Sequence, residues 1–214
     1  MSEVVPAILV EDEMAYKNAV DRLHPFAKRV HIDISDGEFA PSFTIGIDKL
    51  WWPQEWVVDI HAMVARPVEH LEALVALKPR TIIFHVEAVA DIVPVLQQVK
   101  RAGIKAGIAL QRPTVPATVA NAIKEADHVM IFTGDLGKYG GTASMMQLEK
   151  VRLVKMINPN AEIGWDGGVN ADNAYTLTQG GVDILNVGGA IAKAADPAQM
   201  YATLVSETNK HGVI

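Results

Sequence analysis

Residues 30–34 are Val-His-Ile-Asp-Ile, a short β-branched run that predicts a buried β-strand. His31 and Asp33 are two residues apart, so their side chains point to the same face of that strand. Similar runs recur along the chain, and each predicts a strand. Together the eight runs are Val4–Leu9, Val30–Ile34, Val57–Met63, Thr81–Val86, Lys105–Leu110, His128–Phe132, Ile163–Trp165 and Ile184–Val187.

Helical patterns separate most of these strands. Val68–Leu77, Ile92–Ala102 and Leu148–Ile157 carry apolar residues three and four apart, the spacing of an amphipathic helix. Eight strand and helix pairs in 214 residues give a repeat of roughly 27 residues, which is typical of a compact barrel. The sequence therefore predicts an α/β fold, a (β/α)8 TIM barrel with a parallel eight-stranded sheet. A doubly wound open sheet is the alternative, but such a sheet usually binds its ligand at one switch point and would not easily bring together residues from several separate strands.

The whole chain, residues 1–214, is predicted to form one domain, because no low-complexity or linker-like stretch divides it. The span Asp36–Trp56 departs from the alternation. It is rich in proline, glycine and tryptophan and predicts a long loop with at most a short helix. Its tryptophans Trp51, Trp52 and Trp56 either belong to the core or form a lid or a contact in a homo-oligomer.

Composition limits the class of protein. Hydrophobic residues make up 50% of the chain and charged residues 21%, which is usual for a globular protein with a core. The net charge is −6 and lysine and arginine are scattered, which argues against nucleic acid as a partner. No apolar run reaches the ~18 residues of a membrane span, and the first residues do not resemble a signal peptide. The chain has no cysteine, so we expect a cytoplasmic enzyme without disulfides.

Four polar residues fall where predicted strands end: His31 and Asp33 on the second strand, His61 on the third and Asp166 on the seventh. In TIM barrels the carboxyl ends of the strands share one rim and carry the active site. Two imidazoles and two carboxylates there predict a site for one divalent metal ion. Zinc, manganese, iron and cobalt all suit these ligands. A single rim histidine is more often structural, but the set of four favours a metal.

Glycine pairs supply a second prediction. Gly167-Gly168 follows the seventh strand and Gly188-Gly189 follows the eighth, the two loops that often bind phosphate in barrels. A third pair, Gly140-Gly141, lies after the sixth strand, where it could close over a ligand. The predicted partner is a small molecule that offers a phosphate at one end and metal-binding oxygens at the other. A sugar phosphate has both.

The chain resembles the ribulose-phosphate 3-epimerase family over nearly its full length. The matching stretches are His31–Pro41, Asp59–Met63 with Pro67, Phe84–Ala88, Asp166–Gly168 and Gly188–Gly189. The resemblance implies a (β/α)8 barrel and an isomerase of carbohydrate metabolism, in the pentose phosphate pathway. Enzymes of that family interconvert D-ribulose 5-phosphate and D-xylulose 5-phosphate, so the resemblance implies the same reaction here.

The resemblance also implies residue roles. The metal ligands map onto His31, Asp33, His61 and Asp166, and Met63 keeps a methionine that lines the substrate pocket. Asp33 and Asp166 map onto the paired acid–base carboxylates. One removes a proton from C3 and the other returns one to the opposite face, through an enediolate that the metal stabilises.

The chain departs from the family pattern around this quartet. Ala7 and Val10 stand where the family has serines, and the loop Thr133–Thr142 carries an extra residue. Two alternatives follow for the function. One is a 3-epimerase of another ketose phosphate, such as a hexulose 6-phosphate. The other is a non-catalytic barrel that binds sugar phosphates.

Several further polar residues lie outside this quartet. His85 and Glu87 end the fourth strand, where they either contact the substrate or the metal's surroundings or make a structural hydrogen bond. Asp59 or Asp36 is expected to orient a metal-ligating histidine. His128 is expected at the surface or at the end of a helix.

Overall fold

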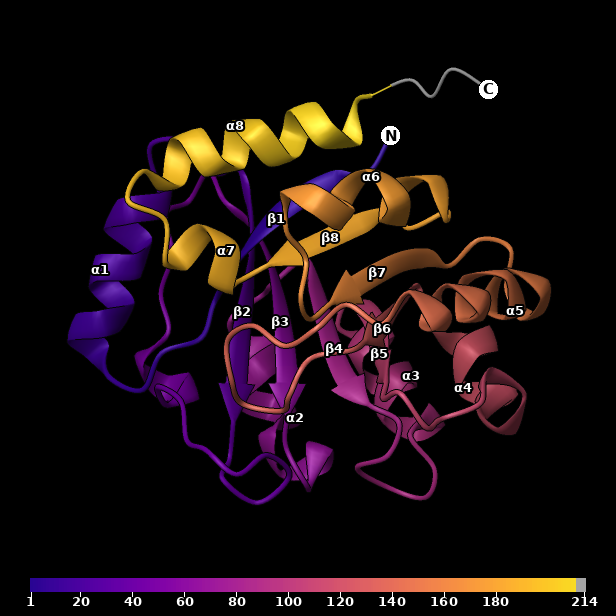
Figure 1. The fold of residues 1–214 in the computed structure, drawn as a ribbon. Coiled ribbons are helices and arrows are strands. Elements are labelled where there is room, and N and C mark those ends of the chain that lie inside the picture. The colour runs from indigo at the N-terminus through magenta and orange to yellow at the C-terminus, as the bar shows by residue number, and fades with distance from the viewer. Residues whose placement is uncertain (211–214) are drawn as a thin grey trace.

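Eight parallel strands close into a barrel in chain order, from β1 to β8, in the computed structural model, which describes residues 1–210 (Figure 1). β1 pairs with β8, from Glu3 opposite Ile184 to Pro6 opposite Val187, so the sheet has no edge. This confirms the predicted barrel and rules out the open sheet. The predicted strand limits agree with the observed ones to within one residue. The strands are β1 Glu3–Ile8, β2 Arg29–Ser35, β3 Val57–Met63, β4 Thr81–His85, β5 Lys105–Leu110, β6 His128–Phe132, β7 Glu162–Asp166 and β8 Ile184–Val187.

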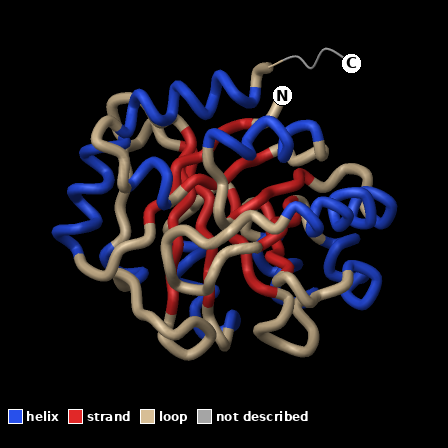
Figure 2. The backbone as a smooth tube through the Cα atoms, in the orientation of Figure 1, coloured by secondary structure: helices blue, strands red, loops and turns tan. Residues whose placement is uncertain are grey.

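Helices surround the strands on the outside of the barrel (Figure 2). Side-chain caps fix the start of three of them: Asp12 before α1, Asn170 before α6 and Asp196 before α8. The three helices expected from the sequence are α2, α3 and α5. The helices are α1 Glu13–Leu23, α2 Pro67–Ala76, α3 Val93–Arg101, α4 Ala120–Glu125, α5 Glu149–Ile157, α6 Ala171–Gln179, α7 Gly189–Ala192 and α8 Pro197–Thr208, with short 3-10 turns η1 Ile47–Lys49, η2 Pro116–Val119 and η3 Met145–Leu148.

The strands are buried on both faces, which explains why they appear as nearly continuous apolar runs. On β4, Ile82 and Phe84 belong to the large core between strands and helices. Ile83, between them, belongs to a smaller cluster with Ala109, Met130 and Phe132 from β5 and β6. Successive side chains of a strand point to opposite faces, so this smaller cluster fills the barrel interior.

The amino-terminal end of the barrel interior holds a group of charged residues, which we call the basal ion cluster. Arg29 is buried there, with its guanidinium 2.7 Å from Asp59, 2.7 Å from Glu3 and 3.0 Å from Glu162. The cluster consists of Glu3, Arg29, Asp59, Arg80, His128 and Glu162. The prediction of a surface His128 is wrong: the ring is buried and its Nδ1 lies 2.9 Å from Glu162. Gly164 makes room for this ring, because a Cβ there would lie 2.5 Å from its Nε2.

The basal ion cluster is expected to make the protein less stable at acidic pH. Burial opposes ionisation of Glu162, but His128, Arg80 and Arg29 hold its pKa well below the usual range. A carboxyl with a depressed folded-state pKa contributes stability above its unfolded pKa, near 4.3, and loses that contribution as pH falls below it. We therefore expect the free energy of unfolding to fall as pH drops from about 5 toward 3. Urea unfolding measured at several pH values in this range should show that the free energy of unfolding changes less with pH in Glu162→Gln than in the wild type. An equal dependence on pH would contradict a depressed pKa for Glu162.

The long segment after β2 forms the expected loop, interrupted only by η1. Trp56 is buried in the core, whereas Trp51 is 47% exposed and packs edge-on against Tyr16. None of the helices within residues 1–210 has the length and apolar character needed to cross a membrane. The final four residues of the predicted domain, 211–214, lie outside the described part of the chain.

Candidate active site

Strand register brings the four predicted ligands to one place at the carboxyl end of the barrel. Asp33 on β2 pairs with His61 on β3, and Asp166 is the last residue of β7. One donor atom from each of His31, Asp33, His61 and Asp166 lies within 4.8 Å of the others. We call these four residues the ligand cluster. His61 Nδ1 is 2.7 Å from Asp33 Oδ1, and His31 Nε2 is 3.3 Å from the same oxygen.

The ligand cluster has the properties of a site for a divalent cation. His31 is fully buried, and neither ring nitrogen has a hydrogen-bond partner among the described residues. A buried polar atom without a partner is costly, and a cation beside Nε2 would remove part of that cost. Asp166 Oδ2 lies 4.0 Å from His31 Nε2 and 3.8 Å from His61 Nδ1, so both carboxylates face the two imidazoles. Two nitrogens and two oxygens suit zinc, manganese, iron or cobalt.

The two carboxylates differ in electrostatic environment. Burial opposes ionisation of Asp33, but the charges of His31 and His61 and the hydrogen bond from His61 lower its pKa. Burial and the nearby charge of Asp33 raise the pKa of Asp166 to about 6. Two acids in one site with pKa values pushed apart are suited to accepting and donating protons in one reaction.

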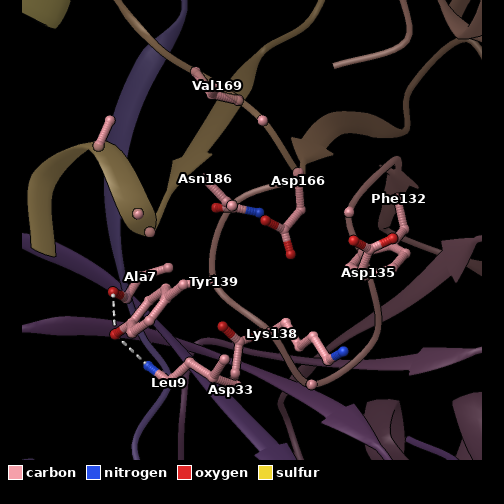
Figure 3. Close-up of a pocket in the computed structure, with 18 of the residues that line it drawn as sticks. Ala7, Leu9, Asp33, Phe132, Asp135, Lys138, Tyr139, Asp166, Val169 and Asn186 are labelled. Carbon is pink, nitrogen blue, oxygen red and sulfur yellow. Dashed lines mark hydrogen bonds between the residues drawn. The ribbon is translucent and has the colours of Figure 1, made fainter. Parts of the chain in front are cut away.

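A cavity opens beside these carboxylates (Figure 3). The side chains of Met63 and Phe132 form an apolar part of the cavity wall. The predicted glycines Gly140, Gly167, Gly168, Gly188 and Gly189 line the same cavity. Gly141 is not among its lining residues and packs against Gly134 instead. Asp33 and Asp166 are therefore placed next to the backbone that was expected to bind phosphate.

The loop between β6 and η3 passes across the carboxyl end of the barrel, in front of the strands in Figure 1. Gly168 N–H donates to the Gly140 carbonyl at 3.0 Å, which holds the loop against the end of β7. Gly167 has a φ of +106°, and a Cβ there would lie 2.0 Å from Gly134 N. Only glycine permits this close approach of two backbones.

Two side chains that the sequence did not single out also line the cavity. Tyr139 reaches β1, where its hydroxyl accepts from Leu9 N–H at 2.7 Å and lies 3.4 Å from the Ala7 carbonyl (Figure 3). Asn186 stands opposite Asp166 in the β7–β8 register, and its Oδ1 is buried without a partner among the described residues. The sequence offered one signal for each of them: the extra residue in the loop that contains Tyr139, and the presence of a polar residue, Asn186, within an apolar strand.

The expected support for the histidines is not where it was predicted. Asp59 belongs to the basal ion cluster, and the carboxylate of Asp36 accepts backbone N–H groups, including that of Ala65 at 2.7 Å. His85 is the residue that contacts the ligand cluster, with its Nε2 2.9 Å from His61 Nε2. Burial lowers the pKa of His85 to about 4.

Comparisons with known proteins agree with this geometry. The profile described as the Ribulose-phosphate 3 epimerase family matches residues 3–192. The chain is 29% identical to the ribulose-phosphate 3-epimerase of Helicobacter pylori, covering 91% of this chain and 92% of that protein. It is 27% identical to the enzyme of the same name from Bacillus subtilis, covering 92% and 94%. Among solved structures, 3-hexulose-6-phosphate synthase from Salmonella typhimurium shares the fold, with a TM-score of 0.72, 16% identity and coverage of 98% and 100%.

Proposed function

The chain belongs to the ribulose-phosphate 3-epimerase family, a family of carbohydrate isomerases, and from this premise we propose that it interconverts D-ribulose 5-phosphate and D-xylulose 5-phosphate. The observation that carries the proposal is the pair of buried carboxylates, Asp33 and Asp166, beside two histidines in one cavity. Inverting C3 requires two proton carriers, and the site offers two.

In the proposed reaction, one carboxylate accepts the C3 proton and the other donates a proton to the opposite face of the same carbon. The reverse reaction exchanges these roles, so each acid must be able to hold or release a proton. The opposite pKa shifts of Asp33 and Asp166 are consistent with that requirement. Met63 and Phe132 would keep bulk water away from the reacting carbon.

His31, Asp33, His61 and Asp166 would hold one divalent cation. Bound there, it would act as a Lewis acid that offsets the negative charge developing on the substrate oxygens. Gly188 and Gly189, and the loop around Gly140 and Gly168, are proposed to bind the phosphate through the backbone. Gly168 N–H already donates to Gly140, so its use by phosphate requires a shift of this loop.

Proton NMR in D2O tests the reaction directly. Metal-replete protein incubated with D-ribulose 5-phosphate is expected to replace the C3 proton with deuterium and to produce D-xylulose 5-phosphate. Removing the metal with a chelator should abolish both signals. Exchange at C3 of D-fructose 6-phosphate but not of the pentose would instead favour a hexulose phosphate as substrate. Binding of both sugars without exchange would indicate a non-catalytic barrel.

A further inference from the structure

A chain of hydrogen-bonding groups leads from the ligand cluster to the loop after β5. His61 Nε2 lies 2.9 Å from His85 Nε2, and His85 Nδ1 lies 3.3 Å from Glu87 Oε2. The other oxygen of Glu87, Oε1, accepts from Gln111 N–H at 2.9 Å and from the Thr114 hydroxyl. The final donors, one backbone N–H and one side-chain hydroxyl, thus both come from the loop after β5.

The direction of each hydrogen bond follows from the donors available. Gln111 N–H can only donate, so Oε1 of Glu87 is an acceptor. A carboxylate has no proton to give, so Oε2 must accept from a proton on His85 Nδ1. His85 is fully buried between Phe39 and Phe132, where a charged ring would be costly, so its Nε2 carries a lone pair. His61 Nε2 must then supply the proton between the two rings.

We propose that Glu87 and His85 are positioning residues that keep a proton of His61 on Nε2, so that Nδ1 is the nitrogen left to bind a metal ion. Without a metal ion, His61 Nδ1 donates to the Asp33 carboxylate at 2.7 Å, and a bound ion would replace that proton. His61 Nδ1 is the atom that lies 2.7 Å from Asp33 and 3.8 Å from Asp166. A metal ion can bind only an unprotonated ring nitrogen, and the hydrogen bond on the other nitrogen decides which one that is. The inference deepens the proposed function, since it concerns the same metal site.

We call the hydrogen-bonded chain from Glu87 through His85 to His61 the relay. Glu87→Gln is expected to reverse the direction of its hydrogen bonds with almost no change in side-chain shape. Gln111 N–H requires an acceptor, so the amide oxygen takes the place of Oε1 and the NH2 group faces His85 Nδ1. His85 must then accept on Nδ1 and carry its proton on Nε2. The proton between the rings now belongs to His85, so His61 Nε2 must accept it. The His61 ring then keeps its one proton on Nδ1, the nitrogen that should bind the metal.

Two measurements test the relay. Nitrogen-15 NMR of histidine-labelled, metal-free protein is expected to show His85 protonated on Nδ1 in the wild type and on Nε2 in Glu87→Gln, with the His85 signals assigned from their loss in His85→Phe. Titration of the metal-free protein with Co²⁺ against a chelator is expected to show affinity about 10–100-fold weaker in Glu87→Gln.

The double variant, which combines Glu87→Gln with His85→Phe, separates reversal of the relay from the loss of the Glu87 charge. Once His85 is phenylalanine, reversal cannot pass to His61, so adding Glu87→Gln should weaken Co²⁺ binding by about fivefold or less. Phe39 and Phe132 provide aromatic surroundings for that ring, and thermal unfolding checks that each variant folds. The same loss of affinity in both backgrounds, or an unchanged His85 tautomer in Glu87→Gln, would overturn the relay. Wild-type protein that binds no Co²⁺ would overturn the proposed metal site instead, and the His85 nitrogen signals would still decide the relay.

Discussion

Replacing Asp166 with asparagine is expected to lower kcat for epimerisation by about 10²–10⁴-fold. The proposed reaction needs a proton carrier on each face of C3, and an amide cannot accept or deliver that proton. The ionised partner Asp33 remains, so Asp166→Asn should still exchange the C3 proton of one epimer with D2O while failing to convert it. Asp33→Asn should retain exchange with the other epimer.

Proton NMR of each variant with each purified pentose phosphate measures exchange and conversion separately. Both residues are also proposed metal ligands, so metal content and thermal unfolding must accompany the rates. The two variants control for each other, because a general loss of metal would abolish exchange from both epimers equally. Conversion at near wild-type rates in either variant would contradict the two-carboxylate mechanism.

Replacing Arg29 with methionine is expected to cost about 3–5 kcal/mol in the free energy of unfolding. The substitution keeps much of the side-chain volume but removes the cation that contacts Asp59, Glu3 and Glu162. These carboxylates would then face each other at the amino-terminal end of the barrel, with Arg80 and His128 as their remaining partners among the described residues.

Urea unfolding compares this variant with Arg66→Met. Arg66 also has two carboxylate partners, Glu38 and Glu69, but it is exposed on the surface. Water and salt screen such a pair, so the loss of Arg66 should leave the free energy of unfolding nearly unchanged. Equal effects of the two substitutions would show that burial of Arg29 adds nothing to stability.

The barrel was predictable because its signal is local and repeated. A strand such as Val57–Met63 can be recognised from its own β-branched residues, and the return of that pattern along the chain indicates the architecture. The ligand cluster followed from the same logic, since Asp33 and His61 lie toward the carboxyl ends of β2 and β3 and Asp166 ends β7. Parallel strands in one barrel bring such ends together whatever their separation in sequence.

What escaped prediction depends on contacts between distant segments. The sequence places His128 at the start of a strand, but only the closed barrel reveals that its ring contacts Glu162 in the interior, where Glu162 also contacts Arg29. Tyr139 lies in a loop, where no periodicity indicates which way a side chain points. The histidine support was sought in carboxylates near the ligands in sequence, whereas the contact comes from a second histidine, His85.

The ligand cluster draws its members from β2, β3 and β7, and this distribution orders events during synthesis of the chain. His31, Asp33 and His61 leave the ribosome early, but Asp166 follows only after most of the protein has been made. β7 must also find its place between β6 and β8 before that carboxylate reaches the others. A nascent chain can therefore offer three ligands for a long interval, and the complete set exists only once the barrel has closed.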